Sequence, residues 1–256
     1  VIAINKLVKE VILLINESRE NIAIAINSSM SLLYWQIGQK INEKVLHYKR
    51  AQYGKQIVVS LSRQLTIEFG NSFSEKNLRR MMQFANLFPD KEIVVTLIRQ
   101  LSWSHILAVL PIDDSVKRDF YIQMCILEKW SVRTFRQRIE SMLYERTAIS
   151  KKPEKTIIND LELLKNEQKL SADLVFKDPY FFDFLGLSDT YSERDLESSI
   201  IVELQKFIIE LGSDFAFLAR QKRITIDNRD YYIDLLFYHR KLNCLIAIDL
   251  KISEFD

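Results

Sequence analysis

The spacing of apolar residues differs between the first part of the chain and its last part. Across residues 2–144, apolar positions recur every three or four residues, which is the period of helices that bury one face. Near the end, the pattern changes to three extended apolar stretches at 215–226, 231–239 and 243–252, separated by short polar connections. The chain is therefore predicted to begin as a helical domain and to end in a small sheet.

Cap residues mark the ends of several predicted helices. The helical stretch 53–69 is expected to stop at Gly70, and Ser74 is expected to cap a helix over 75–88. Two helices joined by so short a turn form a helix-turn-helix candidate. Further helices are predicted at 91–101, 103–110, 113–128 and 131–145.

The composition changes between the helical and the extended regions. Residues 149–173 are polar and have few aromatic residues, so we predict a linker there. The linker separates a helical N-terminal domain, 1–148, from a second domain, 174–256. In the second domain a capping box at Ser192 opens a helix that is expected to close at Gly212.

The composition narrows the class of protein. Five Gly and four Pro in 256 residues favour long helices over a turn-rich β fold. Two Cys and three scattered His argue against zinc sites and disulfide frameworks, and they indicate a reducing, cytoplasmic setting. No P-loop or dinucleotide motif is present and no apolar run is long enough to span a membrane, so neither an organic cofactor nor a membrane partner is expected. A net charge of +2 permits a nucleic-acid partner.

Charged residues lie inside the predicted strands. Side chains alternate across a strand, so Asp249 and Lys251 should share one face. If the turn is centred between Lys241 and Leu242, Asp234 lies opposite Asp249, with the two side chains about 5 Å apart. Two carboxylates this close repel unless a cation lies between them. Mg²⁺ is the expected ion because it prefers oxygen ligands, and Mn²⁺ is the alternative.

An ordinary ion pair is the competing interpretation. Asp234 and Lys251 could pair on a solvated face of the sheet, where such pairs are common and contribute little. The flanking residues are apolar on both faces, which is typical of strands covered on both sides. Burying unpaired carboxylates would cost several kcal/mol, so the metal interpretation is favoured here.

The order of these residues resembles the core of PD-(D/E)XK nucleases, with an acidic helix, an Asp in one strand and D-x-K in the next. Longer runs, including "YWQIGQKI", "FGNSFSEKNLRRMMQF", "LSWSHI" and "YYIDLLFYHRKLNCLIAIDLK", resemble the bacterial DUF1016 or YhcG family of nucleases over almost the whole chain. The resemblance implies a helical N-terminal domain and a partial α/β core of the restriction-endonuclease type. It also implies Mg²⁺-dependent hydrolysis of DNA by an endonuclease.

The resemblance assigns roles to individual residues. It makes Asp234 and Asp249 the metal ligands and Lys251 the catalytic lysine. Glu197 would be the acidic residue of the first core helix, and Gln221 would lie near the phosphate or simply stabilise its strand. Glu193, one helical turn before Glu197, is the reserve candidate.

Two features depart from the family pattern. Asp249 stands where the family usually has Glu, and the shorter side chain could shift the metal. The nuclease core normally continues with another helix and strand after the lysine, whereas this chain stops at Asp256. We therefore expect the native protein to continue, because an uncovered sheet would expose an apolar edge.

The helix after Ser74 is the candidate DNA contact. Its first turns carry Lys76, Asn77, Arg79 and Arg80, and recognition helices contact DNA mainly through their first turns. A solvated face on a packing helix is an equal alternative. Two other functions stay open, namely a non-cleaving DNA-binding or protein-interaction module and an assembly role for the N-terminal helices. Cutting both strands with a single site would favour a homodimer.

Overall fold

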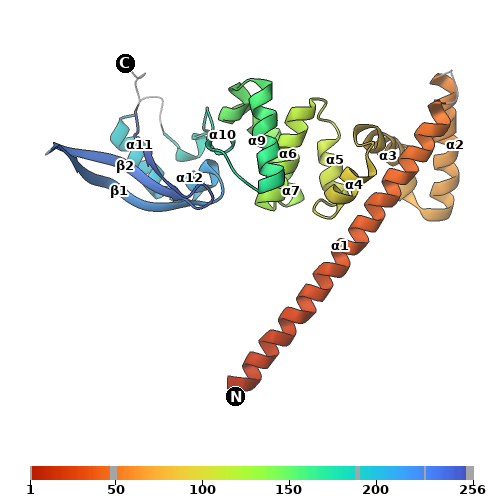
Figure 1. Ribbon diagram of the computed structural model, residues 1–256, viewed down its shortest axis with the longest axis horizontal. Helices are drawn as coiled ribbons and strands as arrows, with labels where there is room; N and C mark the ends of the chain where they lie inside the picture. The colour runs from red at the N-terminus through yellow and green to blue at the C-terminus, as the bar shows by residue number, and fades with distance from the viewer. Residues whose placement is uncertain (1, 47–50, 188–190, 228, 252–256) are drawn as a thin grey trace. The chain divides into compact units, whose positions relative to one another are not determined.

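The computed structural model describes residues 2–46, 51–187, 191–227 and 229–251. Their contacts divide the chain into two compact units (Figure 1). The helical unit comprises Val1–Arg118 and Trp130–Arg136, and the sheet unit comprises Asp119–Lys129 and Gln137–Asp256.

The helical unit is built around one long helix. Its elements are α1 (Ile2–Leu46), α2 (Ala51–Phe69), the 3-10 turn η1 (Asn71–Phe73), α3 (Glu75–Leu87), α4 (Lys91–Ile98) and α5 (Trp103–Val109). α6 (Ser115–Glu128) and α7 (Val132–Glu140) each contribute residues to both units. Most predicted helix ends agree with these bounds to within a few residues, but the helix predicted at 131–145 ends at Glu140, and Met142, with a φ of 53°, separates it from the next helix.

α1 and α3 cross at very close range. A Cβ atom placed on Gly38 of α1 would lie 2.0 Å from the Met81 carbonyl oxygen of α3, so only glycine fits there. Around this crossing Tyr34, Leu78 and Met81 are buried in one apolar cluster with residues of α2. The core of the helical unit therefore depends on a backbone approach that helical periodicity does not reveal.

The predicted turn between α2 and α3 exists, but its role in DNA binding is a separate question. Gly70 has a φ of 85° and ends α2, as expected of a C-terminal glycine. Ser74 stands at the N-cap of α3, yet its side chain makes no capping hydrogen bond. The helix-turn-helix assignment stays a prediction, because α3 also packs closely against α1 at Gly38.

The first half of α1 lies outside the core of its unit. Every side chain from Asn5 to Asn27 is exposed, although many of them are apolar. From Ser28 onward the helix is held by its neighbours, beginning with a 2.8 Å hydrogen bond from the Ser28 hydroxyl to the Ile98 carbonyl.

The segment predicted as a linker contains regular structure. α8 (Leu143–Arg146), η2 (Ala148–Lys151), α9 (Glu154–Glu167), α10 (Ala172–Val175) and η3 (Asp183–Leu185) follow α7. α9 buries Ile157, Leu161 and Leu164. The two compact units meet at residues 118/119, 129/130 and 136/137, and not at the predicted domain bounds. The bounds at 148 and 174 therefore stay a prediction.

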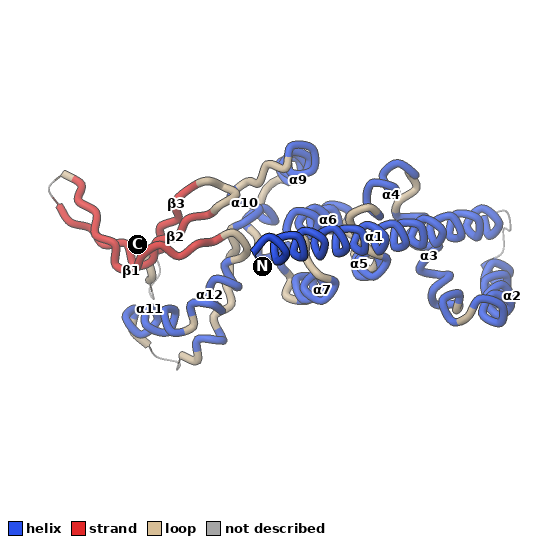
Figure 2. The backbone as a smooth tube through the Cα atoms, turned by 90° about the horizontal axis from the view of Figure 1, so that it is seen from below, coloured by secondary structure: helices blue, strands red, loops and turns tan. Residues whose placement is uncertain are grey.

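The sheet has three antiparallel strands in the order β1 (Phe215–Ile226), β2 (Arg229–His239) and β3 (Cys244–Ile248). α11 (Glu193–Val202) and α12 (Leu204–Leu211) cover one face, and their apolar residues join Leu235, Phe237 and Ile246 in a core. Figure 2 shows the β1–β2 hairpin continuing beyond β3. The small sheet and its helical cover agree with the expected α/β core.

One helix of the sheet unit differs from its prediction. The capping box is confirmed, because the Ser192 hydroxyl accepts from the Asp195 amide and the Asp195 carboxylate accepts from the Ser192 amide. The single helix predicted up to Gly212 is instead broken at Glu203, which has φ −101° and ψ 28°. Gly212, with a φ of 130°, ends α12 as predicted.

Candidate active site

The register of β2 and β3 brings the predicted carboxylates together. Leu235 pairs with Ile248 and His239 pairs with Cys244, so the same register carried one residue further places Asp234 opposite Asp249. This is the register that follows from a turn centred between residues 241 and 242. The predicted pairing is therefore confirmed from Leu235 to His239, and the Asp234–Asp249 pair lies one residue beyond the ladder.

β3 ends earlier than predicted. The third extended stretch was expected to run from 243 to 252, but the ladder stops at Ile248, and residue 252 lies outside the described residues. The cause is a change of hydrogen-bond partner, since the Leu250 amide donates to the Asp234 carboxylate at 2.8 Å. Asp249 and Lys251 therefore follow the strand instead of lying inside it.

Asp234 is held in its ionised form by its neighbours. Burial raises the pKa of Asp234, but hydrogen bonds donated by the Leu250 amide and the Gln221 side chain, the contact with the Asp249 side chain and the positive charge of Lys251 outweigh it and leave the pKa below its usual value. The Gln221 amide nitrogen donates to Asp234 Oδ1 at 2.8 Å. Asp234 is thus a fixed anion, and each of its two oxygen atoms already accepts one hydrogen bond.

Lys251 pairs with Asp249 and not with Asp234. Its Nζ lies 3.3 Å from Asp249 Oδ2. This hydrogen bond, followed by the negative charges of Asp249, Glu193 and Asp234, raises the pKa of Lys251 above its usual value. The ammonium group therefore stays charged at neutral pH beside two carboxylates.

The carboxylates lie on an open face, so the expectation that both faces of the strands are covered was wrong. The side chain of Asp249 is 55% exposed and that of Lys251 is 40% exposed. Leu245 on β3 is also 63% exposed. The helices α11 and α12 cover only the opposite face, which is the face that buries Leu235 and Ile246.

Gln221 has an unusual backbone conformation for a strand residue. Its φ is 48°, in the left-handed region that L-residues avoid, and it lies between the pairs Arg220–Leu235 and Lys222–Ile233. Such strain is retained when the surroundings fix it, and it tends to accompany functional sites. Here the strained residue is the one whose side chain holds Asp234.

Glu197 does not join the carboxylate pair. It is buried on α11, and its Oε1 accepts a hydrogen bond of 2.6 Å from Arg220 Nε on β1. The described residues contain no group of three or more His, Cys, Asp or Glu that could hold a metal ion together. By contrast, the reserve residue Glu193 is one of the charges that act on Lys251.

The donor set suits a hard divalent cation. Mg²⁺ is usually bound in proteins by one or two carboxylates, and water and substrate oxygens complete its shell. Asp234 and Asp249 supply two carboxylates on an accessible face, so a third protein ligand is not required. Asp234 and Asp249 are therefore oxygen donors of the kind that a hard divalent cation takes.

Comparisons with known proteins agree with this arrangement. Residues 10–146 match the DUF1016 N-terminal domain, and residues 173–256 match the YhcG PDDEXK nuclease domain. The chain belongs to the DUF1016 and YhcG family. It is 32% identical to the "Putative nuclease YhcG" of Escherichia coli (strain K12) over 275 residues, which cover 96% of this chain and 72% of that protein. No solved structure matches the chain.

The residues predicted to contact DNA lie in the DUF1016 N-terminal domain, and three of them, Asn77, Arg79 and Arg80, are engaged with neighbours. Arg79 forms a 2.7 Å ion pair with Glu75, and Arg80 donates to Asn77 Oδ1 at 3.2 Å. Lys76 is exposed. The ion pair with Glu75 reduces the charge that Arg79 can offer a phosphate, although both Lys76 and Arg79 are exposed.

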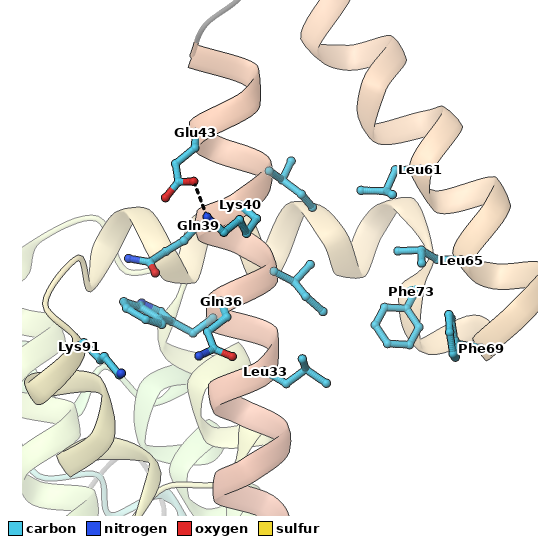
Figure 3. A pocket seen from close by; sticks show the side chains of 13 residues that line it. Leu33, Gln36, Gln39, Lys40, Glu43, Leu61, Leu65, Phe69, Phe73 and Lys91 are labelled. Carbon is cyan, nitrogen blue, oxygen red and sulfur yellow. Dashed lines mark hydrogen bonds and ion pairs between the residues drawn. The ribbon is translucent and has the colours of Figure 1, made fainter.

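An apolar pocket of about 800 Å³ also lies in the DUF1016 N-terminal domain (Figure 3). It opens between α1, α2 and η1, where Leu33, Leu61, Leu65, Phe69 and Phe73 line it. Lys40 and Glu43, which form an ion pair of 3.0 Å, also belong to its lining. The pocket contains none of the predicted site residues, so the candidate chemistry of this family member lies in the nuclease domain.

Sequence reasoning missed two partners of the site. Arg220 was not predicted as the partner of Glu197, and the Leu250 amide was not predicted as a donor to Asp234. Alternation along β1 could have placed Arg220 on the helix-covered face, opposite Leu235. Nothing in the sequence signals that the Leu250 amide turns toward Asp234, since Leu250 continues the apolar pattern of the preceding strand.

No helix in the described ranges has the length and apolar character needed to cross a membrane.

Proposed function

We propose that this protein hydrolyses DNA phosphodiester bonds with a Mg²⁺ or Mn²⁺ ion held by Asp234 and Asp249. One observation carries the proposal. The β2–β3 register aligns two carboxylates, and a lysine lies beside them, within a domain that belongs to a nuclease family. The C-terminal domain is therefore the proposed catalytic part, and the helical domain is proposed to hold DNA through Lys76, Asn77, Arg79 and Arg80.

Each residue of the site has a proposed task. When bound, a divalent cation would make a ligated water more acidic and would neutralise charge on the phosphate. The charged Lys251 would orient that water and stabilise the developing negative charge, because its raised pKa makes it a poor base. Gln221 would position Asp234, and Glu197 would fix Arg220 at the first strand.

Cleavage of plasmid DNA by the full chain tests the proposal. Lys251→Ala should reduce cleavage with Mg²⁺ or Mn²⁺ by about 100-fold or more, while DNA binding is retained. Lys165→Ala, which removes an exposed lysine of α9, is the matched control and should cleave like the parent.

Other outcomes of the same assay favour the alternatives. No cleavage by the parent chain with either ion would support a non-cleaving module. DNA binding that survives Arg79→Ala combined with Arg80→Ala would remove the proposed role of these two arginines and would favour an assembly role for the N-terminal helices.

A further inference from the structure

The β1–β2 hairpin extends past the rest of the sheet (Figure 2). β3 pairs with β2 only from Leu235 to His239, whereas β1 and β2 stay paired as far as Ile226 and Arg229. In the described part of the chain, residues 222–226 and 229–232 therefore form a ribbon of two strands, which we call the basic ribbon. The apolar core of the sheet unit includes Leu235 but no residue of the basic ribbon. Both faces of the ribbon thus lie outside that core.

The exposed side chains of the basic ribbon are mostly cations and tyrosines. Its basic members are Lys222, Arg223 and Arg229. Tyr231 is 49% exposed and Tyr232 is 58% exposed. Lysine, arginine and tyrosine are among the side chains that donate to phosphate oxygens in protein–DNA complexes. The ribbon therefore has the chemistry of a surface that contacts a phosphate backbone.

The acidic member of the ribbon, Asp230, is already paired. Its carboxylate lies 2.8 Å from the Arg223 guanidinium and accepts a hydrogen bond of 2.8 Å from the Thr225 hydroxyl. Lys222 and Arg229 are exposed, and neither forms an ion pair with any of the described residues. The cross-strand pairing thus stabilises the ribbon, while two cations keep their charge available to a ligand.

The basic ribbon is continuous with the candidate active site. Tyr232 precedes Asp234 by two residues on β2, and Arg223 pairs with Tyr232, so both lie on the face of Asp234. Lys222 and Arg229 lie on the opposite face by the same alternation. From Asp234 to Arg229 the strand runs about 17 Å, at roughly 3.4 Å per residue. A ligand that binds at Asp234 and extends along β2 would therefore contact the ribbon.

Duplex DNA fits the shape and the charge of the ribbon. The major groove is about 12 Å wide and admits a two-stranded β-ribbon, whose two faces would then be directed toward the two phosphate walls. Since each DNA strand has one phosphate per roughly 3.4 Å of axis, 17 Å corresponds to about five base-pair steps. Protein interfaces, by contrast, are depleted of charged residues at their centre. Charged residues occur along the whole ribbon, which favours DNA over a protein partner.

We propose that the basic ribbon enters the major groove of duplex DNA and holds the backbone beside the phosphate at the candidate active site. Lys222 and Arg229 contact phosphates on one wall, and Arg223 and Tyr232 contact the DNA on the side of Asp234. The inference rests on the proposed function, because DNA is taken as the ligand. It adds a binding surface in the nuclease domain to the one proposed on α3.

The salt dependence of DNA binding tests the role of the two unpaired cations. Fluorescence anisotropy with a short labelled duplex, in EDTA and at several concentrations of KCl, gives the slope of log K against log[salt] for the full chain. Lys222→Ala with Arg229→Ala should make this slope shallower by about 1.8, because each lost phosphate contact contributes about 0.9. Tyr232→Ala should weaken binding without changing the slope, since it removes no charge.

Two controls separate phosphate contacts from other effects of these substitutions. Lys155→Ala with Lys165→Ala removes the same charge from exposed positions of α9 and should leave the slope of the parent. Lys222→Arg with Arg229→Lys keeps both charges on the ribbon and should also leave it. Equal slopes for the ribbon and α9 alanine variants, or a parent that does not bind duplex DNA, would overturn the inference. So would a ribbon variant that weakens binding to single strands and leaves duplex binding unchanged.

The measurement distinguishes this inference from the proposed hydrolysis, because no divalent ion is present and no bond is cut. Ribbon-dependent binding by a chain that does not cleave with Mg²⁺ or Mn²⁺ would support the inference and refute the hydrolysis. Cleavage by a parent whose salt slope does not depend on Lys222 and Arg229 would refute the inference and leave the hydrolysis in place.

Discussion

At the scale of single residues, Gln221 combines backbone strain with a contact to the candidate metal ligand. Its φ of 48° is unfavourable for any residue with a Cβ atom, and its side chain donates to Asp234. A residue in this conformation contributes to the site only if the rest of the hairpin fixes it. The position of Asp234 thus depends on the paired residues on both sides of Gln221.

At position 221 we predict that glycine is more stable than alanine, which is the reverse of the order in an ordinary strand. Gln221→Gly should be more stable than Gln221→Ala by about 1 kcal/mol, because both lose the amide and only alanine keeps the strain. Urea denaturation measures the difference. Lys222, the next residue of β1, is the control, and there alanine should be the more stable variant, as in an ordinary strand. The same order at both positions would show that Gln221 is not strained.

The strand register that sets the relative positions of Asp234 and Asp249 could be predicted from the sequence. Alternation and the turn position gave the Asp234–Asp249 alignment, because pairing in a hairpin is fixed by its turn. The partners of Glu197 and Asp234 could not be predicted, since they depend on how α11 packs on the sheet and on where β3 leaves the ladder. The ion pair of Lys251 with Asp249, instead of Asp234, follows from that same early end of β3.

At the scale of elements, Gly38 controls the packing of α1 on α3. Alanine normally stabilises a helix relative to glycine by about 1 kcal/mol. At Gly38 the added Cβ would meet the Met81 carbonyl oxygen at 2.0 Å, and a helix backbone cannot move without separating the two helices. The cost of the clash should exceed the gain in helix propensity.

Gly38→Ala is therefore expected to lower the free energy of unfolding by about 3 kcal/mol. Gly54→Ala on α2 is the control, because its nearest contact, at 2.8 Å, is the Cγ1 atom of Val45, a side-chain atom that can shift. In thermal denaturation, Gly54→Ala should have a clearly higher melting temperature than Gly38→Ala. Equal stability of the two variants would contradict the close crossing.

Element boundaries were well predicted where a cap or a turn residue sets them locally. Gly70, Ser192 and Gly212 stop or start helices close to the predicted positions. The break at Glu203 was not predicted, because apolar periodicity continues through it. Periodicity also predicted the helical character of α1, but it did not reveal that residues 5–27 have no neighbours in their own unit.

At the scale of the whole molecule, a buried charge cluster ties together distant parts of the sheet unit. Glu210 of α12 accepts hydrogen bonds from Arg146 of α8 and from the Phe181 amide at 3.1 Å, and Lys177 lies 3.7 Å from it. Arg146 also stacks over the Phe181 ring at 3.7 Å. Burial lowers the pKa of Lys177 to about 8.

The lowered pKa gives a pH dependence with a definite sign. Between pH 8 and 10.5 the unfolded chain keeps the proton on Lys177 and the folded chain releases it, so the free energy of unfolding should rise with pH in this window. The full rise is roughly 3 kcal/mol. Urea titrations of Lys177→Met should lack this rise, whereas Lys165→Met, at an exposed lysine, should retain it. A parent chain whose stability does not depend on Lys177 in this range would refute the prediction.

The sequence alone determined the properties that depend on neighbouring residues, namely the helical period, the caps, the turn and the β2–β3 register. The tertiary structure decided which faces are covered, where Gly38 is needed and how Arg146 meets Glu210, 64 residues away. The physical reason is that local conformation is governed by nearby dihedral angles and hydrogen bonds. Burial and charge pairing instead depend on segments that the folded chain brings together from distant positions.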